Sequence, residues 1–183
     1  MSMVPMQSRV QVRPIEPQEY WRAGELVVAA YRDLPGGHLT DEYATRLADV
    51  ERRAREAEVL VAIGGDGDLF GCVTFVPDAS SPWAELLEPG DAGIRMLAVD
   101  PSAQRRGAGQ ALLDACISRA ADLGRAAIVL HTTPWMSAAH RLYEKAGFQR
   151  LPSRDWKPIP EVPLLAYRLE LPPGPMSSPS GCS

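Results

Sequence analysis

The chain has 183 residues, a net charge of −4, 45% apolar residues and 23% charged residues, which is the balance of a single globular domain. The negative charge, without a dense cluster of Lys or Arg, argues against a protein that binds nucleic acid or membrane surfaces by neutralising phosphates. No stretch approaches the roughly 20 apolar residues of a membrane span, and residues 1–7 lack a signal-peptide core, so we expect a cytoplasmic protein.

Hydrophobic periodicity predicts alternating strands and helices between two loose ends. In chain order these are a strand at 9–13, a helix at about 17–33, a helix at 41–57, strands at 58–63, 69–76 and 93–99, a helix at 109–123, a strand at 126–131, a helix at 138–146, and strands at 148–150 and 164–171. The glycine-rich run 64–68 joins strand to strand, so we interpret it as a hairpin turn and not as a phosphate loop. The pattern favours an α/β (or α+β) domain with a mixed sheet.

The two ends are predicted to be flexible tails. Residues 1–8 show no periodicity, and 172–183 consist largely of Pro, Gly and Ser. Neither end can bury enough apolar surface to offset the entropy of ordering it. We therefore expect one domain over residues 9–171.

The three cysteines, Cys72, Cys116 and Cys182, show no paired spacing, and no Cys/His grouping suggests zinc. We expect two buried thiols and one on the C-terminal tail, in a reducing compartment. No metal site is predicted.

Residues 96–110 have the composition of an anion-binding turn. A predicted strand ends in a proline turn, and Gly107 and Gly109 permit positive φ and leave room for a ligand. The helix that follows would present amide N–H groups without intrahelical partners, at the positive end of its dipole. With Arg105 and Arg106 beside them, these amides suit a phosphate or pyrophosphate. On the glycines alone, an ordinary strand–turn–helix connection stays open.

This segment resembles the acyl-coenzyme A loop of the GNAT family of N-acetyltransferases, Gln/Arg-x-x-Gly-x-Gly/Ala, with Gln104, Gly107 and Gly109 at the three marked positions. A second stretch, 139–148, resembles the family's Ala-x-x-Leu-Tyr-x-Lys-x-Gly-Phe. The element order fits over about 9–171. The resemblance implies a single GNAT-like domain, whose mixed central sheet has a parallel pair at the cofactor site and is flanked by helices.

The resemblance implies an N-acetyltransferase that moves an acetyl group from acetyl-coenzyme A to a primary amine by direct attack in a ternary complex. The acceptor, a small molecule, an amino acid or a peptide or protein, is not identified, and a homodimer stays open. The implied cofactor-binding residues are the strand segment Leu97, Ala98 and Val99 and the loop residues Gln104, Arg105, Arg106, Gly107, Ala108, Gly109 and Gln110.

The resemblance also implies that Tyr143 protonates the departing thiolate. A phenol near the sulfur can donate a proton as charge develops there. The alternative is a half-buried core aromatic, because Ala139, Leu142, Tyr143 and Ala146 form a helical stripe.

Two positions depart from the family pattern. Met136 stands where some members have an Asn that contacts the cofactor, and Arg95 stands where many have a Glu that serves as the base. A guanidinium does not deprotonate an ammonium near neutral pH. The base is therefore unassigned, and the side chains considered for it are Glu85, Glu88, Asp91, Asp155, His131 and His140.

The acceptor pocket is expected between residues 33–38, the loop 77–91 and residues 151–163. Trp83, Trp135 and Trp156 lie in or near these loops and would line the pocket or cover the core. The acidic loop residues slightly favour a cationic acceptor.

Two other functions stay open beside the enzyme. One is a non-catalytic acyl-coenzyme A sensor that keeps the loop but lacks a working base, which the Arg95 departure leaves open. The other is a nucleotide-binding enzyme, ranked last because no Gly-Lys-Ser/Thr follows the loop.

Overall fold

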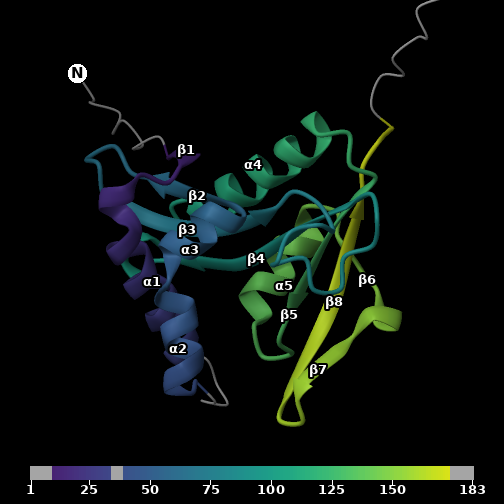
Figure 1. The fold of residues 1–183 in the computed structure, drawn as a ribbon. Coiled ribbons are helices and arrows are strands. Elements are labelled where there is room, and N and C mark those ends of the chain that lie inside the picture. Colours follow the sequence, from purple (N-terminus) through teal and green to yellow (C-terminus); the bar gives the residue numbers. More distant parts are fainter. Residues whose placement is uncertain (1–9, 34–38, 174–183) are drawn as a thin grey trace, which may run out of the picture.

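One mixed sheet runs through the computed structural model, which describes residues 10–33 and 39–173, and helices lie against both of its faces (Figure 1). The predicted tail 1–8 and nearly all of the tail 172–183 lie outside the described residues. No helix in these two ranges is long and apolar enough to cross a membrane.

The elements alternate along the chain much as predicted. In order they are β1 Gln11–Pro14, η1 Pro17–Glu19, α1 Tyr20–Arg32, α2 Asp41–Ala48, α3 Val50–Glu56, β2 Glu58–Ile63, β3 Leu69–Val76, β4 Asp91–Val99, η2 Pro101–Ala103, α4 Ala108–Asp122, β5 Ala127–Thr132, α5 Ser137–Lys145, β6 Gln149–Arg150, η3 Pro152–Arg154, β7 Trp156–Ile159 and β8 Val162–Glu170.

The strand order is β1-β2-β3-β4-β5-β8-β6, with β7 paired to β8. β4 and β5 pair in parallel, whereas β2 and β3 form the predicted antiparallel hairpin. A mixed sheet with one parallel pair and flanking helices confirms the expected fold class.

The single helix predicted over 41–57 is wrong, because the chain breaks at Asp49 into α2 and α3. The Asp49 side chain accepts a hydrogen bond from the Arg52 amide at 3.0 Å and so caps α3. The buried Arg53 guanidinium donates to the Leu47 carbonyl at 2.8 Å and satisfies the end of α2. These two contacts replace the helical hydrogen bonds that a continuous helix would have made.

Strand β7 was not predicted either. Residues 151–163 were expected to be a loop, but Trp156 pairs with Leu164, and Ile159 pairs with Val162. Pro158 cannot donate to a ladder, which is tolerated in this short edge strand. β7 and β8 form a projecting hairpin (Figure 1), and this hairpin becomes one wall of the site described below.

The core has two layers, one on each face of the sheet. One contains α4 and α5, with Leu112, Cys116 and Tyr143 buried against Ile128 and Leu130. The other contains α1 to α3, with the buried residues Val27, Leu47, Val50, Trp83 and Met96.

Cys72 and Cys116 are buried free thiols, as predicted. Burial raises the pKa of Cys72 to about 11 and that of Cys116 to about 12. Neither thiol is therefore ionised near neutral pH. Cys182 lies outside the described residues.

Candidate active site

β4 and β5 form a fork. They pair from Asp91 opposite Ala127 to Ile94 opposite Leu130, and no further. Beyond this point β4 continues along β3 to Val99, whereas β5 continues along β8. The edge of β4 that faces β5 therefore has no strand partner from residue 95 to 99, which leaves backbone hydrogen-bonding groups available there.

A β-bulge lies in β4 at the start of the fork. The register between β3 and β4 shifts there, and Met96 has a φ of 53°, which is uncommon for a residue with a side chain. Bulges bend and re-aim a strand, so this one contributes to the separation of β4 from β5. Leu97, Ala98 and Val99, the strand residues expected at the cofactor, follow directly.

The N-terminus of α4 has unpaired amides. The first backbone bond of the helix runs from the Ala111 amide to the Gly107 carbonyl at 2.9 Å. Among the described residues, no backbone or side-chain acceptor binds the amides of Gly107, Ala108, Gly109 or Gln110. Four adjacent N–H groups at a helix start are an anion site.

The backbone conformation of the loop before α4 leaves these amides unpaired. Arg105 has a φ of 65° and Gly107 a φ of 81°, so two left-handed residues turn the chain into the helix. Neither Arg105 nor Arg106 makes an ion pair with a described residue, and the Arg106 guanidinium lies 5.3 Å from the Phe70 ring centroid. Two exposed cations therefore flank the amides, with their charge not neutralised by a neighbouring carboxylate.

The two sequence motifs meet at Gly109. A Cβ atom built there would lie 3.5 Å from Val99 Cγ2 and 3.5 Å from Leu142 Cδ2. The end of β4, the first turn of α4 and the middle of α5 thus converge, although 43 positions (142 − 99) separate Val99 from Leu142. Tyr143 follows Leu142 directly.

Tyr143 is 5% exposed and belongs to the core cluster on the α4 face. Its ring packs at 5.9 Å from that of Phe148 and 6.1 Å from that of Tyr167. Burial raises the pKa of its phenol, and Cys116 adds to the effect, so the hydroxyl keeps its proton at neutral pH. The core packing predicted as the alternative is therefore present, and it leaves a protonated phenol available as a donor.

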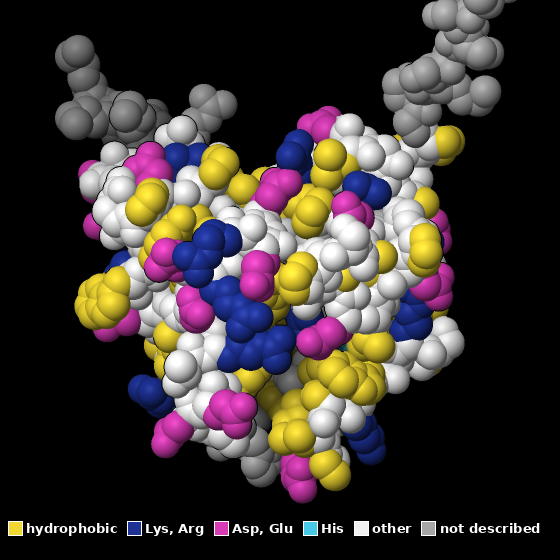
Figure 2. All heavy atoms as spheres, viewed as in Figure 1, with side chains coloured by type: hydrophobic (Ala, Val, Ile, Leu, Met, Phe, Trp, Pro, Cys, Tyr) yellow, Lys and Arg dark blue, Asp and Glu magenta, His cyan; other side chains and the backbone are white. Residues whose placement is uncertain are grey.

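A pocket of about 770 Å³ opens on the other face of the sheet. Its walls come from α1 and α2, the loop after β3, the two strands of the fork and the β7–β8 hairpin. Trp83, Trp135 and Trp156 all line it, which is one of the two alternatives left open for them. Of the predicted lining segment 33–38, Asp33 does not line the pocket, and 34–38 lie outside the described residues. Figure 2 shows a hollow between α2 and the β7–β8 hairpin, with Lys and Arg side chains gathered along its upper rim.

The loop carboxylates considered as bases all have arginine partners. Glu85 binds Arg95 at 3.2 Å and Arg46 at 3.4 Å. Asp155 binds Arg150 at 2.8 Å, and this hydrogen bond lowers the pKa of the Asp155 carboxyl.

The other two carboxylates are bound in the same way, and of the four only Glu85 lines the pocket. Glu88 binds Arg154. Asp91 binds Arg154 at 3.0 Å and Arg168 at 2.8 Å. Each of the four carboxylates therefore already faces a guanidinium, and the preference for a cationic acceptor stays a prediction.

The two histidines considered as bases, His131 and His140, lie in different parts of the structure. His131 lines the pocket, and its Nε2 atom lies 3.0 Å from the Arg154 carbonyl oxygen. His140 lies on α5, where its Nε2 atom is 2.9 Å from the Thr133 carbonyl oxygen and its ring centroid is 5.7 Å from that of Tyr167. Of the two, only His131 lines the pocket.

The family model described as Acetyltransferase (GNAT) family matches residues 21–148. The chain belongs to the GNAT acetyltransferase family. The mycothiol acetyltransferase of Geodermatophilus obscurus is 36% identical over 76 residues, which cover 38% of this chain and 25% of that protein. The match thus spans about a quarter of that relative's length.

Solved GNAT structures share the fold. An acetyltransferase of the GNAT family from Staphylococcus aureus Mu50 superposes with a TM-score of 0.70 at 16% identity, covering 90% of this chain and 100% of that one. The structure of yncA from Salmonella typhimurium with its cofactor acetyl-CoA has a TM-score of 0.66 at 22% identity, covering 96% and 100%. At these identities the likeness shows the fold alone.

The two residues that depart from the GNAT family pattern, Arg95 and Met136, both lie in the pocket wall. Arg95 donates to the Trp83 carbonyl at 3.0 Å as well as to Glu85. Met136 precedes α5, and its sulfur accepts a hydrogen bond from the Thr132 hydroxyl at 3.5 Å. Neither residue supplies the group expected from the family pattern, a carboxylate at position 95 or a side-chain amide at position 136.

Sequence reasoning missed several pocket residues. The Thr133 hydroxyl, just past β5, is buried, lines the pocket and has no hydrogen-bond partner among the described residues. Such an orphaned hydroxyl is a ready partner for a ligand. Tyr31 and Tyr43 line the pocket from α1 and α2. For Thr133, the available signal in the sequence was a pair of threonines directly after a predicted buried strand. For the two tyrosines, the sequence indicated only a helical core stripe.

Proposed function

We propose that this GNAT member is an N-acetyltransferase that transfers the acetyl group of acetyl-coenzyme A to a primary amine held in the 770 Å³ pocket. The observation that carries the proposal is the fork between β4 and β5. It lies between a row of unpaired amides on the α4 face and a pocket on the α1–α3 face. A donor and an acceptor can therefore approach the same point from two sides.

The residues present fit acetyl-coenzyme A. The amides of Gly107 to Gln110 and the side chains of Arg105 and Arg106 would hold the pyrophosphate. The unpaired edge of β4 at Leu97 to Val99 would hydrogen-bond an amide-containing arm, and the orphaned Thr133 hydroxyl offers one more polar contact at the fork. When bound, the cofactor supplies an activated acetyl thioester.

Tyr143 would serve as the proton donor at the fork. Its hydroxyl has no hydrogen-bond partner among the described residues, and burial keeps it protonated. Tyr143 directly follows Leu142, whose side chain lies 3.5 Å from a Cβ built at Gly109 in the cofactor loop, which supports a role in the reaction in addition to its role in the core.

The decisive experiment is thiol release from acetyl-coenzyme A across amino acids, polyamines, aminoglycosides and peptides, with acetyl-coenzyme A affinity measured separately by calorimetry. The proposal expects binding together with acceptor-dependent thiol release. Binding without release for any amine would replace the enzyme with a non-catalytic acyl-coenzyme A sensor. Absence of binding would reject both.

A further inference from the structure

Resting on the proposed function, we propose that His131 is the general base, accepting a proton from the acceptor ammonium at its Nδ1 atom. The family's usual strand carboxylate is absent, since Arg95 stands in its place. His131 is the next residue on β5 after Leu130, the last partner of β4. The imidazole therefore lies where the fork opens, in the wall of the pocket.

The hydrogen bond to Arg154 fixes the tautomer. A carbonyl oxygen only accepts, so the Nε2 atom at 3.0 Å must carry the proton. In the neutral ring the lone pair then resides on Nδ1. No described residue hydrogen-bonds Nδ1, which leaves that atom free for a substrate.

The surroundings keep the ring neutral. Burial lowers the pKa of His131, and the charges of Arg95 and Arg154 lower it further. The Arg154 carbonyl and the Asp155 carboxylate act in the opposite direction, but the net shift is downward. A neutral imidazole with a free lone pair is ready to accept a proton at physiological pH.

The other candidates are already engaged. Glu85, Glu88, Asp91 and Asp155 each form ion pairs with one or two guanidinium groups, and the hydrogen bond from Arg150 lowers the pKa of Asp155. His140 has the same type of bond from Nε2 to a carbonyl, but it does not line the pocket.

The proton balance is simple. An N–H bond of the acceptor ammonium breaks, its electron pair stays on the nitrogen, and the proton binds Nδ1 to give an imidazolium. The nitrogen lone pair then forms the new N–C bond as the C–S bond breaks with its electron pair on sulfur, and Tyr143 gives its proton to that sulfur. The nitrogen loses its second proton to solvent, and a solvent proton restores the Tyr143 phenol. His131 returns its proton to solvent through the open pocket.

The test compares His131→Gln with His140→Gln, which removes a matched imidazole outside the pocket. With the best acceptor of the panel, His131→Gln should lower kcat by about 10²-fold or more and remove the acidic limb of the pH–rate profile. His140→Gln should keep that limb. Both variants should bind acetyl-coenzyme A with wild-type affinity, and added imidazole should partly restore His131→Ala.

A second readout needs no turnover. Nitrogen-15 NMR of the free protein should show His131 as the Nε2–H tautomer, titrating below an ordinary histidine. An Nδ1–H tautomer, or a His131→Gln enzyme with the wild-type rate and pH profile, would overturn the assignment while leaving the acetyltransferase intact. A wild-type protein that releases no thiol with any amine would instead reject the proposed function.

Discussion

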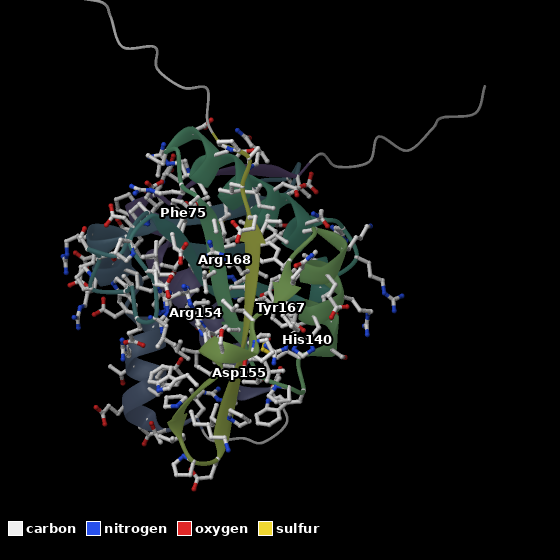
Figure 3. All side chains as sticks on the ribbon, turned by 90° about the vertical axis from the view of Figure 1, so that its right-hand side faces the viewer. Phe75, His140, Arg154, Asp155, Tyr167 and Arg168 are labelled. Atoms are coloured by element: carbon white, nitrogen blue, oxygen red, sulfur yellow. The ribbon has the colours of Figure 1, made fainter. Side chains whose placement is uncertain are left out.

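The buried carboxylate of Asp91 holds Arg154, with 3.0 Å between Oδ2 and Nη1, and Arg154 is the residue whose carbonyl holds His131. Asp91 is 3% exposed and also binds Arg168 on β8. Figure 3 shows Arg154 and Arg168 on one side of β8 and Tyr167 with His140 on the other. The start of β4 is thereby connected to the pocket through η3.

Replacing Asp91 by Asn should therefore affect both stability and rate. Removing one partner of a buried charge pair costs on the order of 3 kcal/mol, and η3 would lose its anchor to β4. We expect a lower melting temperature and a lower kcat with little change in acetyl-coenzyme A affinity. Glu170→Gln is the matched control, because Glu170 also binds Arg168 but is 74% exposed; it should change stability by less than about 1 kcal/mol. Equal effects of the two variants would contradict this account.

Gly109 tests the cofactor loop. Since a Cβ there meets only ordinary contacts at 3.5 Å, Gly109→Ala should fold normally. Gly109→Val places two further methyl groups at the junction of β4, α4 and α5. It should weaken acetyl-coenzyme A binding at least tenfold, or about 1.4 kcal/mol, in a calorimetric titration. A folded Val variant with unchanged affinity would remove the loop from the binding site.

Tyr143→Phe removes one hydroxyl that has no described hydrogen-bond partner. Stability should therefore change by no more than about 0.5 kcal/mol, whereas kcat should fall at least about tenfold if a proton donor is lost. Tyr167→Phe, which removes the hydroxyl of a neighbouring ring, should leave kcat nearly unchanged. Steady-state rates at saturating acetyl-coenzyme A decide between donor and purely structural roles. Identical turnover in wild type and Tyr143→Phe would leave only the structural one.

The lowered pKa of His131 has a consequence for stability. The imidazole of His131 binds a proton less readily in the folded state than in the unfolded chain. Its contribution to the free energy of unfolding is therefore fully present above the unfolded pKa of about 6.5 and is lost as pH falls through the folded pKa. The melting temperature of wild type minus that of His131→Gln should thus decrease from pH 7 to pH 5. A difference that grows on acidification would mean that the charged ring is favoured in the fold.

The positive charge of Arg95 should influence which acceptor amines the pocket prefers. It is half-buried in the pocket wall, whereas the other charged lining residues, Glu42, Arg46, Asp49, Arg52 and Glu85, are exposed. Glu85 is shared between Arg95 and Arg46, so these three side chains keep one net positive charge. Amines that carry a neighbouring carboxylate should therefore have a higher kcat/KM than polyamines of similar size. Arg95→Gln should reduce this preference several-fold. If polyamines are the better acceptors and the variant keeps that order, Arg95 does not select the acceptor.

Most of the fold could be predicted because its elements have clear periodicity. The stripe at Leu112, Leu113, Cys116 and Ala120 in α4 is buried as its spacing required. The break at Asp49 could not be predicted, since it depends on Arg53 reaching the Leu47 carbonyl within the folded core. In the sequence, an Asp or an Arg within a helical pattern gives no indication that the helix breaks there.

Part of the candidate site could likewise be predicted from the sequence, and part could not. The loop before α4 is local in sequence, so its glycines and arginines identified it directly. The base is not local: His131 and Arg154 are 23 positions apart, and Arg154 and Asp91 are 63 apart. Which carboxylates are paired, and which imidazole nitrogen is free, follow only from tertiary contacts.

The central claim is that the unpaired amides of α4 bind the cofactor's pyrophosphate. Amide chemical shifts during titration with acetyl-coenzyme A test it most directly. We predict large changes at Gly107, Ala108, Gly109 and Gln110, with the β2–β3 turn at Gly65 and Gly67 unaffected. Saturable binding that leaves the four α4 amides unchanged would contradict the account.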